Sequence, residues 1–310
     1  MCCCVIDRYE NIDWLIAAKT YYGGLMGISY QIADAHFIDY RLYRLAGVKE
    51  AFRGPAVTGD RYMAFVGAAQ TFGRFADKPY PSLVSRALEI EALNLGRGGS
   101  SSTFVGQNPI LLELVNRAPL VVVQVLSGRS QSNSMFQILD NGMIGINLET
   151  GQPCSAPEFY TWLMDKDKEL TQKIVEETRT NYIQSMTLLL NTIKPPKVLL
   201  WFSNRAPEYQ ERLDGTLVDL FGMFPQFVNR PMVDSLRGNA DAYVECVSNR
   251  GIPQPIVDRG FYPVTFEGAP LPPSPPERVV TMNTYYPSPE MHEDAAAMLI
   301  PVCREILGSK

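Results

Sequence analysis

The fold of this chain can be predicted from one stretch, Phe65-Val66-Gly67-Ala68-Ala69-Gln70-Thr71-Phe72-Gly73. The apolar run Tyr62–Val66 is predicted as a strand that ends at a glycine, and a tight turn and a helix-compatible segment follow. This is the outline of a strand that runs into a nucleophile turn. Ala68 and Ala69 stand in that turn, and a methyl group can neither attack a carbonyl nor take a proton. The stretch therefore predicts an architecture but no nucleophile.

Strands and helices are predicted to alternate along the rest of the chain. The apolar runs predicted as strands are residues 62–66, 92–95, 120–126 and 198–202. The segments predicted as helices are residues 81–88, 108–115, 156–193 and 289–307, the last with Ser288 as its N-cap and a kink at Pro301. Alternation of this kind predicts a parallel sheet with helices on both faces, an α/β fold.

The chain is divided by its composition into three parts. Residues 1–58 are predicted as an N-terminal extension, which serves as a flap or a dimer surface, and residues 59–310 as the α/β domain. Residues 156–196 form a helical insertion that Pro195-Pro196 stops. Residues 270–276, with five prolines, are predicted as a stiff surface loop.

Composition and charge exclude several classes of function. The 310 residues are 46% hydrophobic and 20% charged, as in an ordinary soluble globular protein. A net charge of −5 argues against a nucleic-acid partner. No apolar run approaches the ~20 residues that span a bilayer. We predict neither a metal site nor a cofactor, and the sequence leaves open whether the chain forms a homo-oligomer.

Six cysteines bear on the compartment of this chain. They are Cys2, Cys3, Cys4, Cys154, Cys246 and Cys303, with no CxxC pair. The first three are consistent with metal ligands, lipidation sites, redox thiols or incidental thiols of a frayed terminus, and we favour the last reading. The N-terminus shows no secretory signal, so a reduced cytoplasmic setting is expected.

Three arginines follow predicted strand ends. They are Arg97, Arg129 and Arg205, each in a loop rich in Gly, Ser or Asn. The carboxyl ends of parallel strands meet at one edge of a sheet, and ligands bind there. The three side chains could converge on a carboxylate, sulfate or phosphate, or each could be a chance surface arginine.

Four segments resemble the SGNH superfamily, also called GDSL-type hydrolases. Gly67, Thr71 and Gly73 match the Gly-Asp-Ser-x-Thr-x-Gly turn of that family, with Ala68 at its aspartate and Ala69 at its serine. The resemblance runs over roughly residues 61–310. It implies a flavodoxin-like three-layer sandwich with a parallel sheet.

The other three segments carry further site residues by resemblance. Asn94 and Gly96 match the segment whose glycine amide helps to build the oxyanion hole, and Asn133 corresponds to a second oxyanion donor with altered spacing. His292 matches the histidine of the Asp-x-x-His segment, with Pro289 at the aspartate. More narrowly, residues 52–55, 70–73 and 94–96 resemble a set of uncharacterised alphaproteobacterial proteins.

The resemblance leaves two functions open. One is an esterase or an acyl or group transferase, in which His292 is the base and Thr71, a serine of the run Ser100–Ser102 or an activated water replaces the missing nucleophile. The other is a non-catalytic protein that binds a small anionic or glycan-like ligand at the same edge, with Gly67, Asn94, Gly96, Asn133 and the three arginines as binding residues. A sulfotransferase is less favoured, because the turn after Val66 lacks a basic Ser/Thr run.

Overall fold

The computed structural model describes residue 31 and residues 34–139, 142, 144–260, 262–265, 268–271 and 281–308. The predictions for Cys2, Cys3 and Cys4 lie outside the described residues. So do residues 272–276 of the proline-rich loop and all of the predicted extension before residue 31.

A parallel sheet of five strands forms the centre of the fold. The strands are β3 (Tyr62–Gly67), β4 (Glu91–Gly96), β5 (Val121–Gln124), β9 (Lys197–Ser203) and β10 (Ala242–Val247). Their order in the sheet is β10-β9-β5-β3-β4, and every neighbouring pair is parallel. Counted along the chain, this is the order 2-1-3-4-5 of flavodoxin-like folds. The predicted fold class is confirmed.

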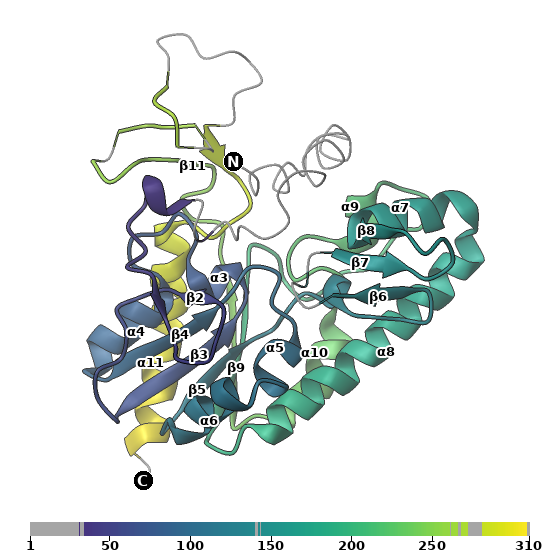
Figure 1. Cartoon of the computed structure of the whole chain (residues 1–310). Helices are drawn as coiled ribbons and strands as arrows, with labels where there is room; N and C mark the ends of the chain where they lie inside the picture. Colours follow the sequence, from purple (N-terminus) through teal and green to yellow (C-terminus); the bar gives the residue numbers. More distant parts are fainter. Residues whose placement is uncertain are drawn as a thin grey trace.

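Helices cover both faces of this sheet (Figure 1). One face packs against α4 (Tyr80–Leu88) and α11 (Pro289–Gly308), which share a core with the side chains of Met63 and Phe65. The other face packs against α5 (Ser102–Gly106), α6 (Pro109–Arg117), α8 (Lys168–Thr192) and α10 (Arg230–Arg237). The inner strands are largely apolar because both of their faces are covered, and buried Gln124 at the end of β5 is an exception.

Two helix boundaries show how local chemistry sets the elements. Ser288 caps α11 as predicted, since its hydroxyl accepts from the backbone N–H of Met291 at 3.1 Å, and the helix continues through Pro301. The block 156–193, which was predicted as helical, consists of two helices, α7 (Ala156–Lys166) and α8. Asp167 is extended between them, and its carboxylate accepts from Leu170 N at 3.0 Å to begin the second helix.

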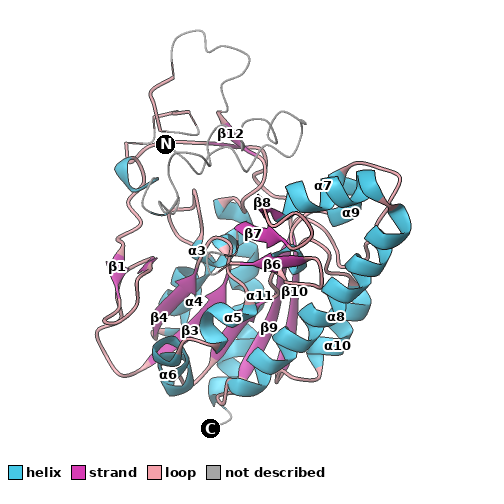
Figure 2. Cartoon of the chain, turned by 45° about the vertical axis from the view of Figure 1, so that its right-hand side comes forward, coloured by secondary structure: helices cyan, strands magenta, loops and turns pink. Residues whose placement is uncertain are grey.

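An accessory lobe, residues 135–175 and 209–227, lies beside the sheet (Figure 2). It contains α7, the start of α8, α9 (Leu217–Phe221) and an antiparallel sheet of β6 (Phe136–Ile138), β7 (Ile144–Asn147) and β8 (Pro153–Ser155). Stacked aromatic side chains form its own core, among them Phe136, Phe159 and Tyr160. The sequence did not predict this small sheet.

Residues 34–53, which we call the cap, pack onto the short helix α3 (Ala69–Phe72). The cap holds η1 (Asp34–His36), β1 (Tyr43–Arg44) and β2 (Ala51–Phe52). The guanidinium of Arg53, at its end, donates to the carbonyls of Gly73, Ala76 and Asp77 at 2.7 Å each. A short pairing of β11 (Gln254–Pro255) with β12 (Met282–Asn283) lies above the same end of the sheet.

A buried ion pair also ties the cap to the main fold. Arg74 Nε donates to Asp34 Oδ2 at 2.7 Å, and Arg74 Nη1 donates to the hydroxyl of Tyr286 at 2.9 Å. Tyr40 donates its hydroxyl to the same carboxylate at 3.2 Å. Both charged side chains are excluded from water, so each needs the other.

No helix in the described part of the chain is both long enough and apolar enough to cross a membrane.

We predict that Asp34→Ala destabilises the protein by about 3–5 kcal/mol, because it leaves the Arg74 charge buried and unpaired. Urea unfolding at neutral pH measures the free energy of unfolding. The double variant Asp34→Ala/Arg74→Met should lose less stability than Asp34→Ala alone. Asp77→Ala is the control, since Asp77 and Lys78 form an exposed pair at 4.0 Å whose loss should cost under about 1 kcal/mol. Equal losses in Asp34→Ala and Asp77→Ala would contradict the role of the buried pair.

Candidate functional site

The turn after β3 lies against the neighbouring strand β4 because two glycines leave room for it. A Cβ on Gly67 would lie 1.9 Å from Thr71 Oγ1, and a Cβ on Gly96 would lie 2.2 Å from the backbone N of Phe72. Neither contact is sterically allowed, so both positions require glycine. The structure thus brings together Gly67, Thr71 and Gly96 at the carboxyl edge of the sheet, as the sequence predicted.

The side chain of Gln124, at the end of β5, fixes this turn. Its Oε1 accepts from the Thr71 hydroxyl at 2.6 Å and from the backbone N–H of Ala68 at 3.0 Å. The Thr71 oxygen also lies 2.9 Å from the Tyr80 hydroxyl, which must be the donor because the Thr71 proton goes to Gln124. The Thr71 hydroxyl is therefore fully bonded, and its residue is excluded from water.

Asn94 closes a second set of hydrogen bonds on the same turn. Its Nδ2 donates to the carbonyl of Thr71 at 3.0 Å, and its Oδ1 accepts from the backbone N–H of Gly96 at 2.9 Å. The Gly96 amide is the predicted oxyanion donor. In this arrangement its hydrogen already has an acceptor inside the protein.

His292 lies in the second turn of α11 and is completely buried. Its ring packs between Tyr80 and Phe202, with ring centres 6.0 Å and 5.2 Å away. Its Nδ1 accepts from the backbone N–H of Tyr80 at 3.1 Å. Burial, aided by the positive charge of Arg53, lowers the pKa of His292 to about 3. The imidazole is therefore neutral at pH 7.

The tautomer of this imidazole follows from its one hydrogen bond. Because Nδ1 is an acceptor, the single proton of the neutral ring stands on Nε2. Nε2 is buried and has no hydrogen-bond partner in the described part of the chain. In this geometry His292 has no unoccupied lone pair with which to take a proton from a nucleophile.

Ala69 itself is covered by the cap. It is 7% exposed and belongs to an apolar cluster with Phe37 and Tyr40 of the cap and with Phe72 and Tyr286. A serine at this position would lie in that cluster. The surroundings of residue 69 are thus filled by apolar packing.

Ser100 lies in the loop after β4 and is 3% exposed. Its hydroxyl has no hydrogen-bond partner within the described residues. The tip of the β6–β7 hairpin lies against this loop, since a Cβ on Gly142 would meet the carbonyl oxygen of Gly99 at 1.7 Å. Beside it, Ser102 donates to Ser185 at 2.9 Å, and Ser185 donates to Gln131 Oε1 at 3.0 Å.

Uncharged polar side chains dominate this edge, and most were missed in the sequence. Ser127 donates to Gln226 Oε1 at 2.8 Å, and Gln226 donates to the Tyr285 hydroxyl at 3.0 Å. Two further buried polar atoms, Gln70 Oε1 and Gln124 Nε2, have no partner in the described part of the chain. Of these residues, only Gln124 could have been identified from the sequence, because it is the only polar residue in the apolar run 120–126.

Arg97, Arg129 and Arg205 are not brought together on one anion site. Arg97 lies 3.8 Å from a carboxylate oxygen of Glu50 and 4.6 Å from the ring centre of Phe104. Arg129 is half-buried in η2 (Gly128–Ser130). Arg97 and Arg205 therefore have different partners, a carboxylate and the carbonyls of a loop, and do not share one anion site.

The Arg205 guanidinium is committed to one loop. It donates to the carbonyls of Met223 at 2.9 Å, Pro225 at 2.6 Å and Val228 at 2.8 Å. Burial lowers the pKa of Arg205 to about 10, which still leaves it charged at neutral pH. Through these hydrogen bonds Arg205 holds the loop before α10 in place.

Asn133 has a structural position instead of an oxyanion position. Its Oδ1 accepts from the backbone N–H groups of Met135 and Phe136, and its Nδ2 donates to Tyr160 and Thr178, all within 3.2 Å. Its four side-chain hydrogen bonds are all made to residues of the accessory lobe and to Thr178 of α8, inside the protein.

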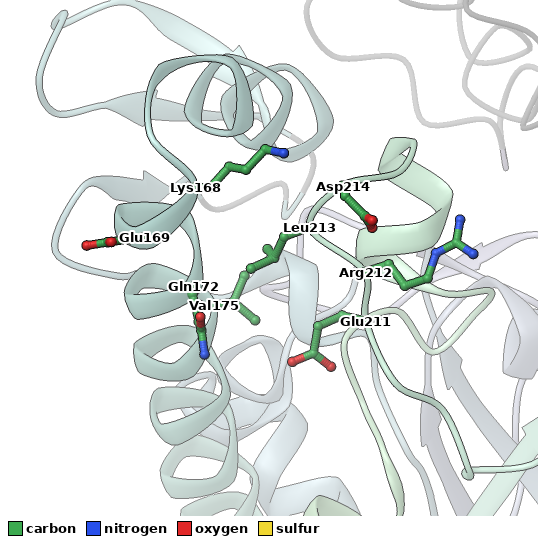
Figure 3. A pocket seen from close by; sticks show the side chains of 8 residues that line it. All are labelled: Lys168, Glu169, Gln172, Val175, Glu211, Arg212, Leu213 and Asp214. Carbon is green, nitrogen blue, oxygen red and sulfur yellow. The ribbon is translucent and has the colours of Figure 1, made fainter.

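A cavity of about 570 Å³ opens elsewhere, in the accessory lobe (Figure 3). It is lined by the first turns of α8 and by residues 211–214, none of which was predicted as a site residue. Over the residues placed by the structure, no cluster of three or more His, Cys, Asp or Glu side chains is arranged to hold a metal ion.

The burial of neutral His292 predicts a pH dependence of stability. Its pKa is about 3 in the folded chain and about 6.5 when unfolded, so the unfolded chain binds one more proton between these values. Stability is then full above pH 6.5 and falls as the pH drops toward 3. His292→Gln should flatten this slope by up to about 1.4 kcal/mol per pH unit. Urea midpoints from pH 7 to 4 measure it, and equal flattening by His36→Gln, at the exposed histidine, would contradict the assignment.

Several solved structures are similar to this chain. A carbohydrate acetylesterase family member from Sinorhizobium meliloti is 12% identical, with a TM-score of 0.41 over 80% of this chain and 99% of that one. The lipase Lip_vut3 from a goat rumen metagenome is 13% identical, with a TM-score of 0.40 over 77% and 95% of the two chains. A family two carbohydrate esterase from Clostridium thermocellum, in complex with cellohexaose, is 14% identical, with a TM-score of 0.39 over 83% and 68%. No residue role is transferred from them.

A search of curated proteins gives no significant match. A family profile matches residues 28–140 and 159–307, which include the whole cap and omit β7 and β8. The narrower resemblance seen in the sequence, to proteins without a known activity, is thereby confirmed. The chain belongs to the family described as a domain of unknown function, DUF6473.

Proposed function

We propose that this protein is a non-hydrolytic member of the SGNH-like α/β proteins, which binds a small neutral polar ligand at the carboxyl edge of its sheet. One observation carries the proposal. The groups that stand where a serine hydrolase has its machinery are bonded to one another: Thr71 to Gln124, Gly96 N–H to Asn94, and His292 Nδ1 to Tyr80 N–H. Free thiols at Cys154, Cys246 and Cys303 fit the cytoplasmic setting that we propose with it.

Hydrolysis of an ester needs a hydroxyl, a base that takes its proton, and amides aimed at the developing oxyanion. Thr71 donates its proton to an amide oxygen, which is not a base at neutral pH. The Tyr80 hydroxyl beside it is no better, because burial raises the pKa of Tyr80 far above neutrality. No base among the described residues is hydrogen-bonded to Ser100. These facts favour binding over catalysis.

The buried polar atoms favour an uncharged ligand. Ser100 Oγ, Gln124 Nε2 and Gln70 Oε1 are each buried without a partner in the described part of the chain. Each such atom costs about 1–3 kcal/mol, which an occupant with hydroxyl or amide groups would recover. Arg97 and Arg205 are engaged with Glu50 and with loop carbonyls, so an anion would gain little here. Of the two ligand classes expected from the sequence, this supports the glycan-like one.

An esterase or an acyl or group transferase is the second candidate. Its support is the resemblance of the turn and the presence of two hydroxyls, Thr71 and Ser100, at the edge. It requires that His292 leave Tyr80 N–H and that the cap uncover Ala69. If it holds, the wild type turns over activated esters, and His292→Ala abolishes that turnover without loss of the fold.

The first test restores the family's missing residues. We expect the double variant Ala68→Asp/Ala69→Ser to stay inactive on p-nitrophenyl acetate and butyrate, as does the wild type. The amide of Gly96 and the lone pair of His292 remain occupied in it, and the new serine faces the cap. Circular dichroism checks that the variant is folded. Turnover by the folded double variant, lost again on His292→Ala, would sink the non-hydrolytic proposal.

The second test probes the ligand class by thermal unfolding of the full chain. Glucose and N-acetylglucosamine are the neutral probes, and glucuronate and glucose 6-phosphate the anionic ones. We expect a neutral probe to raise the Tm, and Ser100→Ala to remove most of that rise because the buried hydroxyl is lost. Ser101→Ala is the matched control, since Ser101 is more exposed and bonds to Thr103. A larger rise with the anionic probes, or no rise with any of them, would contradict the proposal.

A further inference from the structure

The cavity in the accessory lobe shares no residue with the sheet edge. One wall is formed by Lys168, Glu169, Gln172 and Val175 of α8, and the other by residues 211–214 before α9. Its volume, about 570 Å³, falls within the range of roughly 300–1,000 Å³ that small-molecule sites occupy. A ligand of modest size would fit it.

The floor of this cavity is apolar and firmly held. Val175 is almost completely buried in the core of the lobe, and Leu213 packs against the same core. Figure 3 shows the two side chains pointing toward one another between the walls. An apolar group placed on them would gain contacts without disturbing the core.

A fixed carboxylate stands on the wall below. Arg179 binds both oxygens of Glu211, at 2.5 Å and 2.8 Å. This pairing lowers the pKa of Glu211, which keeps the carboxylate charged. Two donors hold it in one orientation, but its positive partner leaves it little excess charge to recognise a ligand.

Opposite charges stand at the rim. Lys168 extends from α8 toward the segment that carries Asp214, while Glu169 points away from the cavity (Figure 3). Among the ion pairs formed by the described residues, none involves Lys168 or Asp214, whereas Arg212 pairs with Asp219 at 3.0 Å. The side chain of Asp167 caps α8, so the helix terminus itself is not the recognising group. One cation and one anion remain for a ligand.

We propose that this cavity binds a small zwitterion with an apolar side chain, an α-amino acid such as leucine. Its carboxylate pairs with Lys168, its ammonium group pairs with Asp214, and its side chain lies on Val175 and Leu213. A ligand with only negative charge would leave Asp214 unpaired, and one with only positive charge would leave Lys168 unpaired. Only a ligand with both charges and an apolar part complements the whole surface.

The test uses the full chain and three probes. L-leucine has both charges, N-acetyl-L-leucine lacks the ammonium group, and L-leucinamide lacks the carboxylate. Methyl NMR follows Val175 and Leu213 during titration. We expect saturable shifts with leucine, and binding weaker by at least about tenfold for either derivative, the loss expected for a charge-assisted hydrogen bond.

Variants that each remove one charge test which residue binds the carboxylate of leucine and which binds its ammonium group. Lys168→Gln should weaken leucine by about tenfold and leave leucinamide unchanged, and Asp214→Asn should weaken leucine and leave N-acetyl-leucine unchanged. Lys173→Gln is the control, since Lys173 is exposed on the same helix and outside the cavity lining. No saturable shift with leucine, equal binding of all three probes, or an equal effect of Lys173→Gln would overturn the proposal. The outcome is independent of what binds at the sheet edge.

Discussion

One side-chain oxygen, Oε1 of Gln124, organises the carboxyl edge of this fold. It lies at the end of a strand buried on both faces and accepts from the first turn after β3 through Thr71 and Ala68 N–H. Inside a low-dielectric core such a bond is strong, and losing it would leave two buried donors without an acceptor. Gln124 therefore fixes the position of α3 on β5. The Thr71 hydroxyl and the Tyr80 hydroxyl are then aligned by the same contact.

The carboxyl edge of the sheet offers no charged group from α3 or the cap, because the nearby arginines are bonded within the protein. Arg53 and Arg74 are both buried beside α3, but Arg53 is saturated by carbonyls and Arg74 by Asp34 and Tyr286. The positive charge of Arg53 still reaches His292 and, after burial, helps to keep its imidazole neutral. The cap thus does more than cover Ala69. Its charge also disfavours the imidazolium that a hydrolase must form during catalysis.

Much of the fold could be predicted from the sequence because four of its five strands contain short apolar runs. β3, β4, β5 and β9 were found in this way, although β4 is an edge strand. β10 was missed because it is an edge strand in which half-buried residues, Tyr243 and Glu245 among them, alternate with buried Val244 and Cys246. The small sheet of the accessory lobe was missed because its strands have only three or four residues and pair antiparallel across turns without a strong signal.

The site was predictable only in part, for a different reason. Gly67, Thr71, Asn94 and Gly96 come together because adjacent parallel strands end at one edge, which chain order alone indicates. The partners that decide what these groups can do come from remote segments. Glu50 beside Arg97, the carbonyls of residues 223–228 around Arg205, and the N–H of Tyr80 on His292 cannot be read from spacing. Pairing, and not residue type, separates a reactive side chain from a structural one.

The same point explains why glycine is required at positions 67 and 96 although residue 69 is an alanine. Gly67 and Gly96 are required because Thr71 and the backbone of Phe72 occupy the space that a Cβ would need. That requirement comes from packing the turn on the sheet and is the same whether residue 69 is serine or alanine. The two glycines therefore indicate how the turn is folded, and they do not indicate whether it is catalytic. The chemistry of the edge depends on the polar atoms that lack a partner among the described residues, which here are Ser100 Oγ, Gln70 Oε1, Gln124 Nε2 and His292 Nε2.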